Sequence, residues 1–287
     1  MDKCRQLKEL IQDKNTYYVP GIYDCLGAKA AEKTGFQTAS ISGNAVAAAA
    51  FGLPDMGLIT MSEVAEVSER IASAVAIPVI ADADTGYGQP LNFMRTVREF
   101  ERRGIAGIHV EDQISPKKCA YYGGSHEIVP LEVQLKKLKA GLEARENSCF
   151  CIIARTDAMV SYGLEETVRR ANAYLEAGAD AAFAVGCREP EELEQLARRV
   201  EGPLMVIIND NSRLNVFNCQ DFADMGIKFV MYAATVRTLV LRQMTEALCA
   251  LKQDGNTRAV LDRLASPADF QELTGLAAAQ ELEYRFS

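Results

Sequence analysis

The sequence predicts an α/β fold of the (β/α)8, or TIM-barrel, class. Short apolar runs recur eight times along the 287-residue chain, and stretches with helical spacing of apolar residues lie between them. The runs are continuous rather than alternating, as expected for parallel strands that are covered on both faces. The eightfold repetition of strand and helix favours a closed barrel. The alternative is an open doubly wound sheet, for which eight strands are many without a second domain.

The eight strands follow from the apolar, β-branched runs. Helical stretches before several of them end in glycine, which closes a helix well because it adopts the left-handed conformation. Four such glycines are Gly35, Gly104, Gly178 and Gly226. The predicted strands are Tyr17–Pro20, Thr38–Ser42, Val79–Asp82, Gly107–Glu111, Cys151–Arg155, Ala181–Val185, Leu204–Ile208 and Phe229–Tyr232.

The helices between the strands carry clear start signals. Thr60 and Glu63 have the spacing of a capping box, and Pro130 and Pro190 suit the first turn of a helix. Apolar residues three and four apart complete the pattern. The predicted helices include Val64–Ala74, Glu165–Glu176 and Glu191–Val200.

The chain ends in more helix than one barrel needs. Residues 1–287 are predicted to form a single barrel domain, of which residues 233–287 are a helical C-terminal extension. Helical spacing covers Val236–Lys252 and Thr257–Leu264, and a short tail follows.

Composition narrows the classes of function. The net charge of −8 and the pI of about 5.0 argue against a nucleic-acid or anionic-membrane partner. The most apolar run, Ala45–Leu53, is far shorter than the roughly 20 residues of a membrane span, and the N-terminus lacks the apolar core of a signal peptide. Eight cysteines without a CxxC pair indicate reduced thiols and a cytoplasmic protein.

Acidic residues gather at the ends of two predicted strands, where the chemistry of a barrel resides. Asp82 and Asp84 point the same way in an extended chain, and Glu111 ends the next strand. Buried carboxylates side by side are costly unless a cation neutralises them. Because the chain has only 2 histidines, oxygen ligands and therefore Mg²⁺ or Mn²⁺ are favoured. Capping of the next helix by the aspartates is the alternative.

Two further polar residues lie on these strands. Arg155 ends an apolar strand, where a buried guanidinium needs an anion. A substrate carboxylate or phosphate is one candidate partner, and an internal salt bridge with Asp157 is the alternative. His109 is better explained as a hydrogen-bonded core residue than as a ligand.

The segment from Gln113 to Pro130 is polar and has no apolar periodicity, which is typical of a lid. It contains Cys119 beside Lys117 and Lys118, and neighbouring cations favour a thiolate. An exposed loop with an ordinary cysteine is the equally weighted alternative.

Taken in this order, the motifs resemble the isocitrate lyase/phosphoenolpyruvate mutase superfamily. The resemblance runs from about Tyr17 to Leu251. It rests on Ser40–Asn44 (SISGN), Gly52–Asp55 (GLPD), Asp82–Gly88 (DADTGYG), Val110–Gln113 (VEDQ), Lys117–Cys119 (KKC) and Ala154–Ala158 (ARTDA).

The resemblance implies a barrel whose last helix is exchanged with a neighbouring subunit, in a homotetramer built from swapped dimers. It also implies Mg²⁺, or Mn²⁺, bound mostly through waters and chelated by a 2-oxo acid or its enolate. The metal side of the site would be formed by Asp82, Asp84 and Glu111, with Asp55 close by.

The resemblance assigns roles to the remaining residues as well. Ser42, Gly43 and Asn44 would line the pocket for the carboxylate of the 2-oxo acid, and Arg155 would bind substrate. Lys117 and Cys119 would lie on a gating loop, with Cys119 as the acid that protonates the enolate product.

Two stretches depart from the lyases of this family. The loop continues Ala120-Tyr121 where the lyases have Gly-His, and strand six ends in Val185-Gly186 where they carry a Glu. The Val-Gly pair is closer to the oxaloacetate decarboxylase branch, which generally lacks the loop cysteine. Asn209 is our candidate for binding the second carboxylate, and the alternatives are Arg188, Asn211 and Arg213.

Three functions are therefore open. The first is a Mg²⁺-dependent C–C bond lyase acting on a small 2-hydroxy dicarboxylic or tricarboxylic acid, of the substituted malate or methylisocitrate type, that gives pyruvate or a related oxo acid through an enolate. The second is an oxaloacetate or 2-oxo acid decarboxylase, or a phosphonate-processing relative, which needs no thiol. The third is a non-catalytic small-acid binding protein, which the retained acids and Arg155 disfavour.

Overall fold

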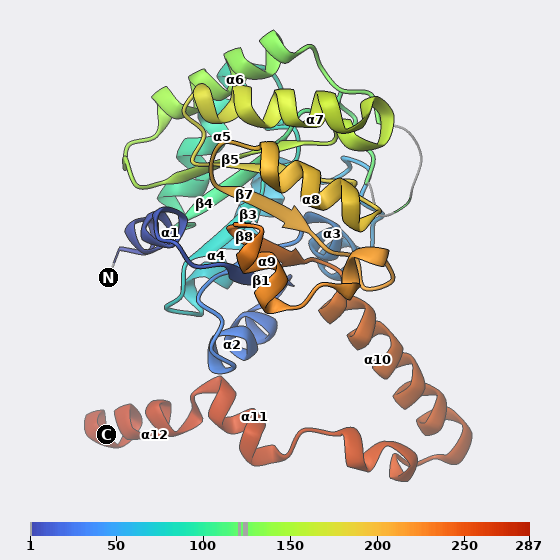
Figure 1. Cartoon of the computed structure of the whole chain (residues 1–287). Coiled ribbons are helices and arrows are strands. Elements are labelled where there is room, and N and C mark those ends of the chain that lie inside the picture. Colours follow the sequence, from blue (N-terminus) through green and yellow to red (C-terminus); the bar gives the residue numbers. More distant parts are fainter. Residues whose placement is uncertain (1, 120–121, 123–125) are drawn as a thin grey trace.

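The predicted barrel is present in the computed structural model, which describes residues 2–119, 122 and 126–287 (Figure 1). Eight parallel strands are hydrogen-bonded in sequence order, and β1 pairs with β8 to close the ring, so the open-sheet alternative is wrong. The strands are β1 (Tyr17–Ile22), β2 (Ala39–Ile41), β3 (Val79–Asp82), β4 (Gly107–Glu111), β5 (Cys151–Thr156), β6 (Ala181–Ala184), β7 (Leu204–Ile207) and β8 (Phe229–Tyr232).

The strand bounds agree closely with the sequence. Strands β3, β4 and β8 match the prediction, and the other five differ by one or two residues at their ends. The register also brings the polar strand ends together. Asp82 of β3 pairs with His109 of β4, and Glu111 of β4 pairs with Arg155 of β5.

Helices surround the barrel, and their start signals mostly hold. Thr60 caps its helix in a capping box, and Pro190 lies in a first turn, whereas Pro130 is an N-cap residue. The predicted helix Glu165–Glu176 is present as the second part of a longer helix, which begins at Ala158 and is kinked at Gly163, where φ is 77°. The surrounding helices are α2 (Cys25–Lys33), α3 (Gly43–Phe51), α4 (Met61–Ser73), α5 (Pro90–Arg102), α6 (Leu131–Ala144), α7 (Ala158–Glu176), α8 (Pro190–Arg199) and α9 (Cys219–Asp224).

An additional helix, α1 (Lys3–Gln12), covers the N-terminal end of the barrel. Its Leu7 and Ile11 pack against the apolar barrel interior. That interior includes Ile80, Ile153, Phe183, Met205 and Phe229, all almost fully buried. The interior of the barrel is therefore closed by α1 at its N-terminal end, and it can open to a ligand only at its C-terminal end.

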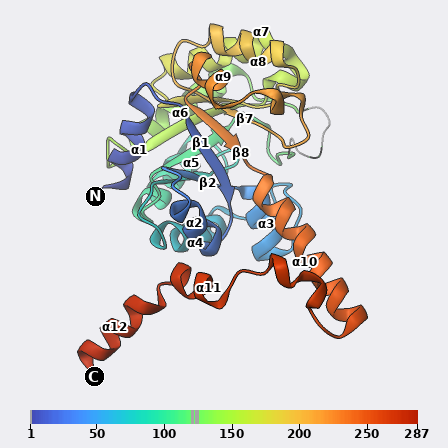
Figure 2. The same cartoon turned by 60° about the horizontal axis from the view of Figure 1, so that its bottom comes forward.

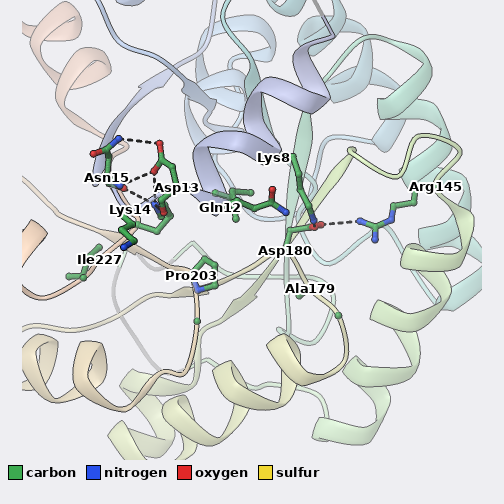
Figure 3. A pocket seen from close by; sticks show the side chains of 15 residues that line it. Lys8, Gln12, Asp13, Lys14, Asn15, Arg145, Ala179, Asp180, Pro203 and Ile227 are labelled. Atoms are coloured by element: carbon green, nitrogen blue, oxygen red, sulfur yellow. Dashed lines mark hydrogen bonds and ion pairs between the residues drawn. The ribbon is translucent and has the colours of Figure 1, made fainter.

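Asp180, just before β6, is the centre of a charge cluster at this N-terminal end. Its carboxylate accepts a hydrogen bond from the Ile152 N–H (2.7 Å) and pairs with Arg145 (3.1 Å) and with Lys8 of α1. Figure 3 shows Lys8 and Arg145 converging on Asp180 from different elements. We call Asp180, Lys8 and Arg145 the Asp180 cluster.

After β8 the chain leaves the barrel as a helical arm (Figures 1 and 2). The predicted helix over Val236–Lys252 is present, and Thr257–Leu264 is helical but of the 3-10 type. The short tail is in fact two more helices, and α11 returns to α2 through an ion pair between Glu272 and Lys33 (2.9 Å). The arm comprises α10 (Thr235–Asp254), η3 (Arg258–Arg263), α11 (Pro267–Thr274) and α12 (Leu276–Phe286).

The arm carries many large apolar side chains that are exposed in the described chain. Helices α10, α11 and α12 bury no residue, and large apolar side chains such as Leu248 and Phe286 are exposed. Among the helices that the structure describes, none is both long and apolar enough to cross a bilayer. None of the eight cysteines, all of which lie in the described part of the chain, forms a disulfide bond.

Candidate active site

The polar strand ends surround a cavity of about 80 Å³ at the C-terminal end of the barrel. Several predicted site residues line it, whereas Gly43, Asp84, Glu111 and Lys117 are not part of its wall. The polar part of the wall is formed by Ser42, Asn44, Asp55, Asp82, His109, Cys119, Arg155, Asn209 and Arg237, and the apolar part by Phe183, Val185, Ile207, Met231, Ala233 and Ala234.

Lys117 lies just behind this wall, buried among carboxylates. Its Nζ is 2.5 Å from Asp55 Oδ1 and 2.8 Å from Asp84 Oδ1. The Lys117 ammonium therefore neutralises two acids, a role that the sequence did not reveal. Lys117 and Asp55 are 62 residues apart in the sequence, so the pairing follows from the fold alone.

The backbone that carries the acids after β3 is tightly folded. Asp84 and Tyr87 have φ values of 45° and 57°, in the left-handed region that residues other than glycine seldom adopt. Gly86 (φ 84°) is required, because a Cβ there would lie 2.7 Å from Phe93 Cδ2. The Asp84 carbonyl accepts a hydrogen bond from the Glu111 N–H (2.9 Å). The strained turn therefore fixes Asp84 beside Glu111.

The pKa values of the three buried acids shift in different directions. Burial alone would raise the pKa of Asp82, but neighbouring charges, His109 first, lower it to about 2. Burial raises the pKa of Asp84 to about 6, against the opposing charge of Lys117. Burial also raises the pKa of Glu111 well above its usual range. Asp84 and Glu111 therefore ionise less readily than exposed carboxyls do.

The buried charges of the site do not balance. Within the described residues no three His, Cys, Asp or Glu side chains are close enough to enclose an ion directly. Both Glu111 carboxylate oxygens are buried without a hydrogen bond. Among the described residues, three cations, Lys117, Arg155 and Arg237, face five carboxyl groups, those of Asp55, Asp82, Asp84, Glu111 and Asp157.

Such an excess of buried negative charge is destabilising unless a cation shares the site. Oxygen-only donors favour Mg²⁺ or Mn²⁺. Since the acids do not converge on one point, they fit an ion that keeps several of its waters. Asp82 lines the cavity, and Asp84 and Glu111 lie behind it.

Arg155 is held rigidly on the cavity wall. Its Nε and Nη2 donate to the two carboxylate oxygens of Asp157 (2.8 Å each), and its Nη1 lies 3.0 Å from Glu111 Oε2. Its guanidinium carbon is 5.7 Å from the Phe183 ring centre, within the range of a cation–π contact. The internal salt bridge with Asp157 is therefore present, and the same guanidinium also lines the cavity.

His109 is buried, but it is not the hydrogen-bonded core residue expected from sequence. Its Nδ1 is 3.5 Å from Asp82 Oδ1, and neither ring nitrogen makes a hydrogen bond. The ring stands edge-on to Phe183. Burial lowers the pKa of His109 to about 4, so the imidazole is neutral at pH 7. It offers the cavity a neutral donor or acceptor.

Cys119 reaches the cavity from the loop after β4. The Asn44 side-chain amide donates to Cys119 Sγ (3.2 Å) and to the Tyr122 hydroxyl (3.3 Å). These contacts tie the loop to α3, whose N-cap residue is Ser42. The departure at Ala120-Tyr121 lies outside the described residues, as do Gly123 and Gly124.

Arg237 is the site residue that sequence reasoning missed. It lies in the first turn of α10, lines the cavity and donates to the Asn44 side-chain carbonyl. Its position shortly after β8 was the signal in the sequence, because the segments after the strands carry the chemistry of a barrel.

Of the four candidates for binding the second carboxylate, Asn209 lines the cavity, while Arg213 pairs with Glu189 (3.0 Å) on the exposed surface. Arg188 and Asn211 are exposed and are not in the wall.

Similarity to known proteins agrees with this geometry. The protein family described as phosphoenolpyruvate phosphomutase matches residues 7–252. The chain belongs to this family. Because the match extends from α1 into α10, the resemblance to the PEP mutase/isocitrate lyase superfamily is confirmed over the whole barrel.

Curated relatives cover nearly the whole chain. The petal death protein of Dianthus caryophyllus is 38% identical over 98% of this chain and 88% of its own length. The 2,3-dimethylmalate lyase of Eubacterium barkeri is 34% identical over 100% of this chain and 99% of its own. The 2-methylisocitrate lyase of Aeropyrum pernix is 38% identical over 94% and 86%, respectively.

Solved structures give the same result. A phosphoenolpyruvate phosphomutase from Streptomyces platensis superposes with a TM-score of 0.93 at 31% identity, covering 99% of both chains. A phosphonopyruvate hydrolase in complex with oxalate and Mg²⁺ superposes with a TM-score of 0.90 at 30% identity, covering 100% of this chain and 99% of that one. This member of the PEP mutase family is thus an enzyme of a superfamily of lyases, mutases and hydrolases.

Proposed function

We propose that the protein is a Mg²⁺-dependent C–C bond lyase that cleaves a small 2-hydroxy dicarboxylic acid to pyruvate or a related oxo acid. The observation that carries this proposal is that Asp82, Arg155 and Cys119 line one cavity. Such a cleavage needs three groups: an acid beside the metal, a guanidinium that binds the substrate carboxylate, and a thiol that donates a proton. The named lyases among the relatives, for 2,3-dimethylmalate and 2-methylisocitrate, support the same class.

The residues divide the work of binding. Mg²⁺, held on the side of Asp82, Asp84 and Glu111, supplies positive charge to the oxyanion when bound. Arg155, fixed by its two bonds to Asp157, binds the carboxylate next to the hydroxyl carbon. Ser42, Gly43 and Asn44 complete the pocket for that carboxylate.

Gly43 keeps the pocket open beside Asp82. A Cβ at this position would lie 2.8 Å from Asp82 Oδ2, so any larger residue would displace the carboxylate. A glycine therefore lets the backbone of α3 approach the metal-side acid closely.

Cleavage requires two proton movements in opposite directions. As the hydroxyl loses its proton, the adjacent C–C bond breaks and its electron pair passes to the second fragment, which becomes an enolate. Asp55, which lines the cavity and pairs with Lys117, is our candidate to accept the hydroxyl proton. Cys119 then gives its thiol proton to the enolate carbon.

The apolar wall supports a substituted malate over a tricarboxylic acid. Phe183, Val185, Ile207 and Met231 line the cavity, and Val185 stands at the end of strand six, where the lyases of the family carry a Glu. Alkyl groups of a substituted malate would pack against this wall. Arg237 and Asn209 remain to bind the second carboxylate.

The second candidate is an oxaloacetate or 2-oxo acid decarboxylase or a phosphonate-processing relative. The specific observation in its favour is Val185, which places an apolar group in the wall at the end of β6. The third candidate, a non-catalytic small-acid binding protein, would use the same cavity without turnover.

One assay separates the three functions. Purified protein with Mg²⁺ is given 2,3-dimethylmalate, 2-methylisocitrate, oxaloacetate or phosphonopyruvate, and pyruvate is followed by coupled NADH oxidation. We expect pyruvate from the malate, with no turnover in EDTA. Pyruvate from oxaloacetate or phosphonopyruvate alone would favour the second candidate. Full activity in EDTA would contradict the metal requirement.

We further propose that the barrel and its C-terminal extension form one domain, that the protein works in the cytoplasm, and that it is a homotetramer in which the arm binds a neighbouring subunit. The uncovered apolar side chains of α10, α11 and α12 support the assembly. Light scattering at micromolar concentration should give a tetramer, and truncation after Leu251 should weaken it. A full-length monomer of 31.4 kDa would contradict this proposal.

A further inference from the structure

Asp112 is a fully buried acid that stands directly after β4 and outside the cavity wall. Its Oδ1 accepts a hydrogen bond from the Asp157 N–H (3.0 Å), and its Oδ2 accepts from the Tyr174 hydroxyl (2.7 Å) and from Arg170 Nη1 (3.1 Å). Tyr174 and Arg170 both come from α7 and are buried. The Asp112 carboxylate is therefore saturated with donors that the fold holds in place.

One of these donors leads to the cavity. Asp157, whose N–H is bound by Asp112, is also the residue whose carboxylate holds the Arg155 guanidinium through two bonds. A shift of the backbone at Asp157 would move that carboxylate and the guanidinium with it. Because a bound carboxylate is read by two parallel hydrogen bonds, a small displacement of the guanidinium weakens binding strongly.

The same network reaches the end of the loop that carries Cys119. Arg170 Nη2 donates to the Val129 carbonyl (2.9 Å), and the Val129 N–H donates to the Asp112 carbonyl (2.8 Å). Val129 lies where the loop rejoins α6. The network thus fixes both Arg155 and the return of the loop.

We infer that Asp112 is a positioning residue for the substrate-binding guanidinium, with Tyr174 and Arg170 holding its carboxylate. The inference rests on the proposed function in one respect, namely that Arg155 binds a carboxylate. It extends that function, because residues of α7 outside the cavity then determine the position of the Arg155 guanidinium through Asp112 and Asp157.

The Asp180 cluster provides a matched control at the opposite end of the same strand. Asp180 accepts the N–H of Ile152, near the start of β5, as Asp112 accepts the N–H of Asp157, just after its end. Both carboxylates are buried and both bind a cation. A role in stability alone would give the two acids the same phenotype.

The experiment measures the Kd of oxalate in the presence of Mg²⁺ by titration calorimetry, with melting temperatures recorded alongside. Asp112→Asn should weaken oxalate binding by about tenfold or more, because the guanidinium is no longer held in place. Asp180→Asn should change the Kd less than about twofold while lowering the melting temperature. For an accepted substrate, Asp112→Asn should raise KM more than it lowers kcat.

A gentler pair keeps the test open if the first variants unfold. Tyr174→Phe removes one donor to Asp112, and Lys8→Met removes one donor to Asp180. We expect a rise of about threefold in the oxalate Kd for Tyr174→Phe and none for Lys8→Met.

Equal Kd values in the Asp112 and Asp180 variants would overturn the inference. So would a wild-type protein that does not bind oxalate, because Arg155 would then hold no carboxylate. Failure of the lyase proposal is seen separately, as oxalate binding by wild-type protein without turnover of any acid.

Discussion

The two ends of the barrel both bury carboxylates, but these carboxylates are fully paired with cations at only one of them. At the N-terminal end, Asp180 is met by Lys8, by Arg145 and by a backbone N–H. At the C-terminal end, the three cations Lys117, Arg155 and Arg237 are outnumbered by five carboxyl groups, and the turn that carries Asp84 is strained. The groove at the N-terminal end is nevertheless the larger, at about 530 Å³ against about 80 Å³.

This difference shows which property marks the functional end. At the N-terminal end, a buried carboxylate that is fully paired with cations holds α1 on the barrel and needs nothing further. Unbalanced charge and backbone strain lower stability, so they persist where a ligand completes the site. The size of a cavity does not distinguish the two ends, whereas the sum of their charges does.

The largest expected effect is a loss of cleavage activity at the C-terminal end of the barrel with the fold unchanged. Cys119→Ser replaces the proposed proton donor by a much weaker acid of similar size. C–C cleavage should fall by about 10²–10⁴-fold while oxalate binding is nearly kept. Steady-state kinetics and titration calorimetry measure the two quantities.

Cys187→Ser is the matched control for that variant. Cys187 follows β6 outside the cavity wall, and burial raises the pKa of its thiol to about 12. Its replacement should leave cleavage within about twofold of wild type. Near-normal cleavage by Cys119→Ser would instead favour the decarboxylase candidate.

The next largest effect is a loss of stability at the N-terminal end of the barrel. Asp180→Ala leaves Lys8 and Arg145 without their shared acid and removes the acceptor of the Ile152 N–H. Denaturant unfolding should show a loss of about 3–5 kcal/mol. The kcat of the remaining folded enzyme should equal that of wild type, and a large drop in kcat would show that the two ends are coupled.

A smaller effect depends on pH. Because the pKa of Asp84 is raised to about 6 by burial, this carboxyl binds a proton below that pH and competes with the metal. Mn²⁺ affinity should fall by about tenfold per unit of pH below pH 6. Asp180→Asn, at the other end of the barrel, should show the same dependence as wild type. An unchanged Mn²⁺ Kd between pH 7 and pH 5 in wild-type protein would contradict it.

Much of this arrangement could be predicted from the sequence, because parallel strands with short loops bring their ends together. The end of β3 placed Asp82 on the cavity wall, and the order of strands placed Glu111 and Arg155 beside it. Local rules suffice for such residues, since each side chain acts near its own strand. The period of two failed for Asp84, because the chain leaves the extended conformation after Asp82 and Asp84 lies in a left-handed turn behind the wall.

The remaining features depend on long-range contacts that no local pattern encodes. Lys117 could have faced Cys119 or the acids, and only the path of the loop directs its ammonium to Asp55 and Asp84. Arg237 reaches the cavity from α10, beyond the last strand. The apolar spacing of Cys4, Leu7 and Ile11 is helical, but the packing of α1 against the end of the barrel likewise depends on the fold.

The central claim is that the unbalanced acids at the C-terminal end bind the divalent cation used in cleavage. Electron paramagnetic resonance of free Mn²⁺, in the presence of oxalate, counts bound ions in wild type, Asp84→Ala and Asp180→Ala. We predict one Mn²⁺ per chain in wild type and in Asp180→Ala, and none at the same concentrations in a folded Asp84→Ala. Retention of the bound Mn²⁺ by Asp84→Ala would contradict the claim.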